Sequence, residues 1–90
     1  MPKTARQLER YFKGAANHYR IEILVLVDRN QGMTLEGITE NLNANVKTIS
    51  EHTKKLVAAG LLNKKYRGKY VTHELSPYGK RFLEFMRSFN

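Results

Sequence analysis

The stretch that decides the fold is residues 34–75, which read TLEGITENLNANVKTISEHTKKLVAAGLLNKKYRGKYVTHEL. Thr34 offers a hydroxyl that can cap a helix, and the residues after it carry an apolar face at helical spacing. That face consists of Leu35, Ile38 and Leu42. Asn43 tolerates the left-handed conformation of a tight helix exit, and Asn45 can cap the next helix. The pattern predicts two helices joined by a three-residue turn.

The second of these helices, predicted over about residues 46–59, has a buried face and a polar face. The buried face is predicted to hold Ile49, Thr53, Leu56 and Val57. The opposite face displays Lys47, Ser50, Glu51 and Lys54. Gly60 stands in the usual terminating position, and after it the apolar period changes from about 3.6 residues to about two. This change predicts two strands, residues 62–66 and 70–75, around the basic tip Arg67-Gly68-Lys69.

Two further helices are predicted before this stretch. The first, about residues 4–13, carries an apolar stripe and reaches its expected end at Gly14. The stripe consists of Leu8, Tyr11, Phe12 and Ala15. Asn17 can cap the second, which extends to about Arg29 and is apolar nearly all round, so it should be buried centrally. Its β-branched content would also suit a strand, but its length favours a helix.

A last helix is predicted after the hairpin, with Ser76 as its cap and Pro77 in its first turn. One side of it carries Tyr78, Phe82, Phe85, Met86 and Phe89. The fold class is therefore α+β and mainly helical: four helices, a two-stranded hairpin and a C-terminal helix. Two helices joined by a short turn and followed by a basic-tipped hairpin are the arrangement of a winged helix-turn-helix. The length fits one domain, residues 1–90.

The positive charge of the chain is concentrated in this part of the sequence. Residues 47–69 hold seven of the sixteen basic residues and one acid, Glu51, so they carry +6 of the net charge of +8. A local positive field raises the concentration of counter-ions and favours a polyanion as partner. Double-stranded DNA is therefore the first partner to consider.

Several segments resemble the ArsR-type and MarR-type transcriptional repressors. Residues 45–56, NVKTISEHTKKL, followed by AGLL at 59–62, are similar to the recognition helix of that family and its exit. LSPYG at 75–79 resembles the family's strand-to-helix junction, and NHYRIEIL at 17–24 resembles the opening of its second helix. The departures are Thr53, where leucine is usual, and the absence of the cysteine pair that metal-sensing members use. The resemblance implies a DNA-binding regulator that pairs through its first and last helices.

The first turns of a recognition helix face base edges in the major groove. The residues predicted to read bases are Val46, Lys47, Ser50 and Glu51. Lysine can donate to guanine, valine can touch a thymine methyl, and glutamate can accept from cytosine. The residues predicted to contact phosphates or the minor groove are Thr48, His52, Lys54, Lys55, Lys64, Lys65, Arg67 and Lys69. The alternatives are a solvated helix face and, for Lys64 and Lys65, protection of an exposed strand edge.

Aromatic residues of the last helix predict a second contact surface. Tyr78 and Phe82 can complete the core, whereas residues 85–89 lie beyond its reach and would leave an apolar patch that is unusual for a soluble monomer. A second copy of the chain could cover that patch, which predicts a homodimer. The expected interface consists of Leu8, Tyr11, Phe12, Phe82, Phe85, Met86 and Phe89.

Other classes of site find little support in the sequence. His18 and Glu22 have the spacing of two ligands on one helix face, but two ligands are not a metal site, and His52 and His73 stand alone. The sequence contains no acid pair, no nucleophile with a plausible base and no glycine-rich phosphate loop, so we expect no enzyme, metal or cofactor. The apolar runs are too short for a signal peptide or a membrane span, and we expect a cytoplasmic protein.

The sequence therefore favours a homodimeric, sequence-specific DNA-binding regulator; repression is the expected mode, and activation is the alternative. One alternative is a winged-helix protein-interaction module of a larger complex. Another is an architectural protein that binds duplexes without reading their sequence. Glu51 argues against the second alternative, because a glutamate facing phosphates weakens binding unless it reads a base. The operator, the regulated genes and any small-molecule effector are not encoded in a readable pattern.

Overall fold

The computed structural model describes residues 2–90, which form five helices and three strands. In chain order these are α1 (Ala5–Ala15), α2 (His18–Arg29), β1 (Met33–Thr34), α3 (Leu35–Leu42), α4 (Val46–Ala58), β2 (Leu62–Arg67), β3 (Tyr70–Leu75) and α5 (Pro77–Arg87). Met1, the first residue of the predicted domain, lies outside the described residues. The predicted order of four helices, a hairpin and a last helix is confirmed.

Side chains at the predicted caps begin most of the helices. Asn17 accepts the backbone N–H of Tyr19 at 2.9 Å, and Asn45 accepts that of Lys47 at 2.8 Å. Thr34 and Ser76 likewise accept backbone N–H groups of α3 and α5. Asn43 adopts the left-handed conformation, with φ of 49°, between α3 and α4. These contacts satisfy N–H groups that a helix start leaves without partners, so the boundaries follow from local sequence.

The end of α1 was predicted wrongly. The helix continues to Ala15, and Gly14 is a buried residue inside it rather than its stop. A Cβ atom at Gly14 would collide with the Cβ atom of Ala59, so the glycine allows α1 to approach the end of α4 closely. Gly60, in contrast, has a positive φ of 79° and ends α4 as predicted.

The core lies where α2, α3 and α4 meet the base of the hairpin. Its fully buried large side chains are Ile23, Leu24, Val27, Ile38, Ile49, Leu56, Leu61, Leu62 and Leu83. Thr53 is also buried, and its hydroxyl donates to the Ser50 carbonyl oxygen at 2.9 Å, so a polar residue is accommodated there. The prediction that α2 is buried nearly all round is wrong for Ile21, which is 39% exposed, and Val57 is half-buried rather than buried.

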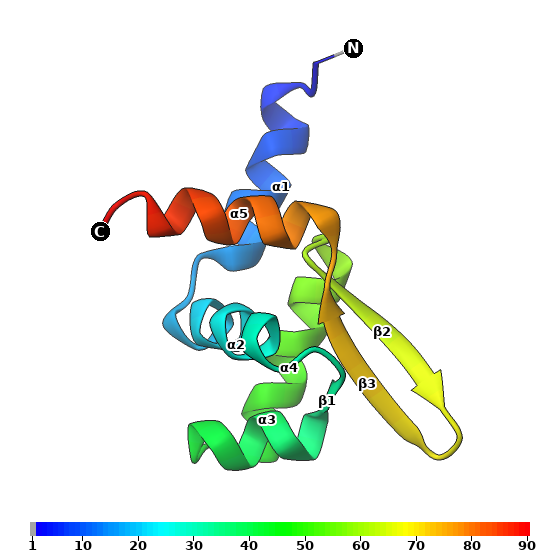
Figure 1. Ribbon diagram of the computed structural model, residues 1–90. Coiled ribbons are helices and arrows are strands. Elements are labelled where there is room, and N and C mark those ends of the chain that lie inside the picture. Colours follow the sequence, from blue (N-terminus) through cyan, green and yellow to red (C-terminus); the bar gives the residue numbers. More distant parts are fainter. Residues whose placement is uncertain (1) are drawn as a thin grey trace.

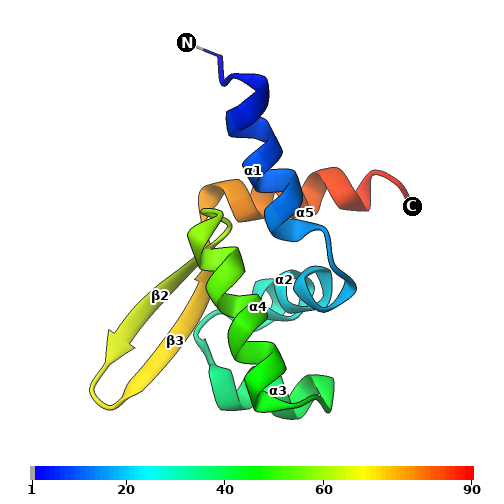
Figure 2. The same cartoon turned by 180° about the vertical axis from the view of Figure 1, so that it is seen from behind.

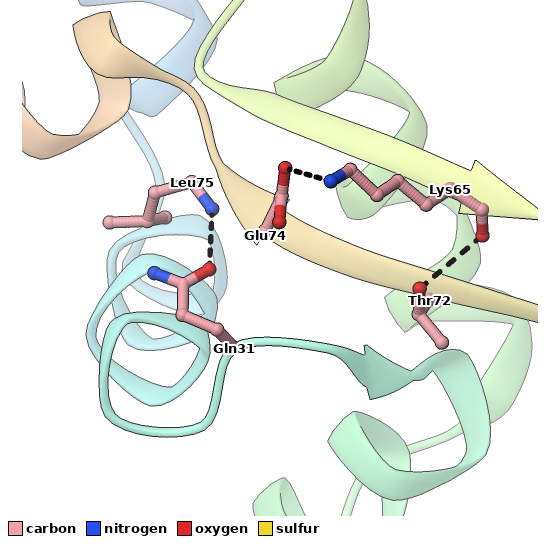
Figure 3. Close-up of polar contacts among 5 residues, drawn as sticks. All are labelled: Gln31, Lys65, Thr72, Glu74 and Leu75. Carbon is pink, nitrogen blue, oxygen red and sulfur yellow. Dashed lines mark hydrogen bonds and ion pairs between the residues drawn. The ribbon is translucent and has the colours of Figure 1, made fainter.

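The sheet has three antiparallel strands in the order β1-β3-β2, where the sequence predicted two. Met33 of β1 pairs with His73 of β3. The loop before β1 is also attached to β3, because the Gln31 side-chain oxygen accepts the Leu75 N–H at 3.1 Å (Figure 3). A strand of two residues is too short to show alternation, so β1 left no signal in the sequence.

The elements fall into two groups at opposite ends of the molecule (Figure 1). Helices α1 and α5 cross at one end, while α3 and the tip of the β2-β3 hairpin lie toward the other. Helix α4 extends between these ends, and the hairpin lies along one side of it (Figure 2).

Ser76 joins the end of α4 to the start of α5. Its N–H donates to the Leu61 carbonyl oxygen at 3.2 Å, and its hydroxyl donates to the Gly60 carbonyl oxygen at 2.6 Å. The same hydroxyl accepts the Gly79 N–H at 2.9 Å. Ser76 is buried, and together these bonds link the residues directly after α4 to the start of α5.

Candidate nucleic-acid interface

The polar face of α4 presents the residues predicted to read bases. Lys47, Glu51 and Lys54 follow one another at i, i+4 and i+7, and all three are exposed. Val46 is exposed as well, while Ser50 is half-buried on the side of α4 that faces the hairpin. The Asn45 side chain already accepts the N–H groups of Lys47 and Thr48, so these backbone donors are occupied. The side chains of this face are therefore the groups available to a ligand.

The inner face of the hairpin continues this polar surface. Because side chains alternate along a strand, Lys64 and Tyr66 lie on the same face as the buried Leu62. Lys64 lines a small pocket of about 130 Å³ together with Ser50 and Lys54 of α4. The structure thus brings Lys64 together with the candidate base-reading helix.

Lys65 lies on the outer face of the hairpin and is not part of this group. Its Nζ atom pairs with the Glu74 carboxylate at 3.1 Å, and its carbonyl oxygen accepts the Thr72 hydroxyl (Figure 3). Arg67 shares this outer face near the tip, where Gly68 has a positive φ of 61°. Lys69 lies on the same tip, with its Nζ 5.4 Å from the centre of the Tyr70 ring. The two tip cations are exposed at the free end of the hairpin.

The residues predicted to form a dimer interface lie together at the opposite end of the molecule. The Phe12 ring of α1 packs edge-on against Phe82 and Phe85 of α5, with ring centres 5.2 and 6.1 Å apart. Phe12 is 51% exposed and Phe89 76% exposed, whereas Phe82 and Met86 are half-buried against the core. We call the exposed part of this surface, Leu8, Phe12, Phe85 and Phe89, the aromatic patch.

Tyr78 does not complete the core, contrary to the expectation from the sequence. It is 42% exposed and packs against Tyr11, with ring centres 5.2 Å apart. Both rings line a groove of about 290 Å³ between α1 and α5, and the ammonium group of Lys3 lies over them. On the same helix, Leu83 is the buried side chain.

Residues 17–64, more than half of the chain, match the arsR family of bacterial regulatory proteins. The chain belongs to the arsR family. The match covers α2, α3, α4 and the first residues of β2, which includes the candidate base-reading helix. The resemblance found in the sequence is confirmed. No curated protein matches the chain significantly.

Solved structures similar to this arsR-family chain confirm the winged helix-turn-helix fold. HlyU from Vibrio cholerae is 23% identical with a TM-score of 0.85, over 99% of this chain and 97% of that chain. The homodimeric winged helix-turn-helix DNA-binding domain of Mb0332 from Mycobacterium bovis is 21% identical with a TM-score of 0.83, over 97% and 86%. The transcriptional repressor PagR of Bacillus anthracis is 16% identical with a TM-score of 0.82, over 90% and 93%.

His52 of this arsR-family protein faces α2, on a different side of α4 from the hairpin. Its Nδ1 atom accepts the Nε–H of Arg20 at 3.1 Å, and its ring stacks on Tyr19. Burial and the neighbouring Arg20 charge lower the pKa of His52 below its ordinary value. Thr48 is half-buried on the first turn, and Lys55 is exposed toward α1. The structure therefore places His52 away from the polar face of α4 and from Lys64, whereas Lys55 lies at the edge of that face that is nearer to α1.

Two features of the interface were missed by sequence reasoning. Tyr66 on the hairpin is 76% exposed and shares a face with Lys64, and an exposed aromatic ring can stack on bases or sugars. The period of two residues in β2 could have placed Tyr66 there. Arg20, which contacts His52, left no such signal, because the contact joins α2 to α4.

Residues 2–90 of the arsR-family chain contain no group of three or more histidine, cysteine, aspartate or glutamate side chains placed to hold a metal ion. His73 is buried, its Nδ1 atom lies 3.0 Å from the Met33 carbonyl oxygen, and burial lowers its pKa. Among the same residues no helix has the length and apolarity that crossing a membrane requires.

Proposed function

We propose that the chain is a homodimeric, sequence-specific DNA-binding repressor. The observation that carries the proposal is the exposed strip of Lys47, Glu51 and Lys54 on a capped helix, continued by Lys64 on the hairpin beside it. A helix with mixed charges on its exposed face can discriminate bases in the major groove, where each base pair presents its own pattern of donors and acceptors. The family membership supports this use of α4.

Within this proposal, residues divide into two roles. Val46, Lys47, Ser50 and Glu51 read base edges. The phosphate and minor-groove contacts come from Thr48, Lys54, Lys64, Arg67 and Lys69, with His52, Lys55 and Lys65 at the margins of the surface. Phosphate contacts fix the position of the protein on the duplex, whereas base contacts provide its sequence preference.

The proposed dimer joins two chains through the aromatic patch, together with the half-buried Tyr11, Phe82 and Met86. The homodimeric state of Mb0332, which has the same fold, supports this arrangement. Repression is the mode named for PagR, another protein with this fold. In this proposed role, residues 1–90 form one DNA-binding domain that works in the cytoplasm and catalyses no reaction.

The proposal is tested by selecting bound duplexes from a random pool with the wild type, Lys47→Ala and Glu51→Ala. We expect the wild type to select an inverted repeat with half-sites about one helical turn, or a multiple of it, apart. Each variant should change the preferred base at one symmetric pair of positions and cost about 1–3 kcal/mol per half-site. Lys80→Ala and Glu84→Ala, on exposed positions of α5, are matched controls that should select the wild-type sequence.

Two outcomes would favour the alternatives. A wild type that binds duplexes without selecting any sequence would be an architectural protein. A wild type that binds no duplex would support a protein-interaction module. If both α4 variants select the wild-type sequence with uniformly weaker binding, α4 does not read bases.

A further inference from the structure

A second basic surface lies on the side of α4 away from the hairpin. Here α1 packs against the C-terminal half of α4, and a groove of about 400 Å³ lies between them. The cations that line it are Arg6, Arg10, Lys13, Arg20 and Lys55. They come from α1, α2 and α4, and only Lys55 belongs to the basic stretch at 47–69. We call this surface the α1 groove.

The charge of the α1 groove is hardly compensated within it. Glu9 is the one acid among its lining residues, and it pairs with Lys13 at 3.5 Å. Five cations and one acid leave a charge of +4 around the groove. Within residues 2–90, Arg6, Arg10 and Lys55 form no ion pair. An anionic ligand would therefore meet cations that no carboxylate holds.

The groove is held in shape by contacts between the helices. Gly14 of α1 packs against Ala59, so small residues form the floor and the cations stand around it. The Arg20 side chain is held by hydrogen bonds to both α1 and α4. Its Nη1 atom donates to the carbonyl oxygens of Lys13 and Gly14 at 3.1 and 3.2 Å, and its Nε atom donates to His52. One guanidinium group thus fixes the end of α1 to α4.

The positions of the cations on α1 separate the groove from the aromatic patch. Arg6, Arg10 and Lys13 follow at i, i+4 and i+7 and share one face of the helix. Leu8 and Phe12, at i+2 and i+6 relative to Arg6, lie on the opposite face. A second copy bound at the aromatic patch would leave the groove accessible.

We propose that the α1 groove binds backbone phosphates of the duplex, outside the contacts made by the first turns of α4 and the hairpin. This inference rests on the proposed function. Lys55 and the exposed Ala58 connect the groove with the polar face of α4, so a duplex held by that face passes beside the groove. Because α1 carries both groove cations and part of the aromatic patch, a dimer joined through that patch would hold the two grooves near its symmetry axis, where they would meet the duplex between the half-sites.

The exposure of the cations favours a polyanion as ligand over a small phosphorylated molecule. Four of the five cations are exposed and Arg20 is half-buried, so the groove does not enclose a small ion. A duplex gains from such exposed cations because each neutralised phosphate releases condensed counter-ions. Arginine also matches phosphate geometry through paired N–H donors. The floor of alanine side chains offers no hydrogen bond to a base edge, so the groove adds no sequence preference.

The test compares the double variant Arg6→Gln/Arg10→Gln of residues 1–90 with the wild type on the duplex that the wild type selects. Glutamine keeps α1 helical and removes two charges. The matched control is Arg29→Gln/Lys80→Gln, which removes two exposed charges outside the groove, α4 and the hairpin. Affinity is measured over a series of salt concentrations, and light scattering checks that each variant keeps the wild-type mass.

We expect the slope of log affinity against log salt to fall by about two units in the groove variant, about one for each phosphate that the protein no longer neutralises. The control should keep the wild-type slope, and all three proteins should select the same sequence. Replacing the phosphates between the half-sites by neutral methylphosphonates should lower the slope of the wild type and leave that of the groove variant unchanged.

A groove variant with the wild-type slope and the wild-type sequence preference would overturn this proposal and leave the proposed function intact. A wild type that selects no sequence would contradict the proposed function, and the slopes on a random duplex would still test the groove. A third outcome is that the groove variant and the wild type show equal slopes while inorganic pyrophosphate shifts the wild-type amide resonances of Arg6 and Arg10. In that case the groove binds a small phosphorylated ligand, and the duplex proposal is wrong.

Discussion

Gly79, in the first turn of α5, lies directly on the carbonyl group of Leu61. A Cβ atom at this position would collide with the Leu61 carbonyl oxygen, and backbone cannot move aside as a flexible side chain can. Gly79→Ala should therefore destabilise the protein by about 1–3 kcal/mol, the usual cost of forcing extra volume into a packed site. Urea denaturation at a fixed protein concentration measures the change in the free energy of unfolding.

Gly37 provides the matched control, because it is also a helical glycine. A Cβ atom there would lie 3.4 Å from Thr34 Oγ1 and 3.6 Å from Met33 Cε, which are ordinary van der Waals distances. Gly37→Ala should stabilise the protein by up to about 1 kcal/mol, because alanine has less conformational freedom to lose than glycine. Equal effects of the two substitutions would contradict the assigned role of Gly79.

His73 should make the stability of the protein depend on pH. Its pKa in the folded state lies below the ordinary value of 6.5 because of burial, so the unfolded state takes up its proton first as the pH falls. Stability is full above about pH 6.5 and decreases below it, until the folded pKa is reached, by at most about 1.4 kcal/mol per pH unit. His73→Asn should reduce this decrease in urea denaturation series between pH 8 and about pH 5. A variant whose stability falls as steeply as that of the wild type would exclude His73 as the cause.

Individual residues also mark the limit of what the sequence could predict. In the sequence, Gly14 looks like a glycine that ends a helix. The structure shows that glycine is needed there because α1 approaches Ala59 closely, and Ala59 is far along the chain. The contacts of Arg20 with His52 and with the end of α1 could not be predicted either, because they also join residues of different helices. Local patterns identify the charged strip on α4, whereas the groups that meet across the α1 groove depend on how three helices pack.

At the scale of elements, the sequence predicted those whose signals are local. The caps at Asn17, Thr34, Asn45 and Ser76 and the left-handed Asn43 define helix boundaries within a few residues. The hairpin was predicted from its alternation and from the glycine at its tip. Strand β1 was missed, since it is a strand only through its pairing with β3.

The hairpin gives a prediction for the salt dependence of DNA binding. Arg67 and Lys69 stand at its free end and belong to no ion pair within residues 2–90. The double variant Arg67→Gln/Lys69→Gln should lower the slope of log affinity against log salt by about one unit for each phosphate released from the hairpin tip. Its sequence preference should hardly change. An unchanged slope would place the hairpin tip away from DNA.

At the scale of the whole molecule, the candidate base-reading surface and the aromatic patch are separated. The basic hairpin tip and the start of α4 lie toward one end, and the aromatic patch lies at the other (Figure 1). The sequence located both surfaces, because each follows from residue types at regular spacing. It misplaced Tyr78, since only packing decides that Tyr78 stays exposed while Leu83 of the same helix is buried.

The aromatic patch predicts the mass of the protein in solution. At micromolar concentration, light scattering should give twice the mass of one 10.5 kDa chain. Phe85→Glu/Phe89→Glu should give the mass of one chain, because charged side chains cannot be buried unpaired in an apolar interface. Tyr66→Glu is the matched control, since Tyr66 is an exposed aromatic residue on the hairpin, and it should leave the mass unchanged. A wild type with the mass of one chain would refute the dimer.

The buried bonds of Ser76 have a consequence for allosteric coupling. They attach the residues that follow the helix proposed to read DNA to the first residues of the helix proposed to pair two chains. In the proposed dimer, a shift of α5 would therefore reach the end of α4 through these buried bonds. Thermodynamic reciprocity then requires that an operator which favours one orientation of α4 also changes the free energy of subunit association. In the proposed dimer, the length of DNA between the half-sites and the strength of subunit association would then depend on each other.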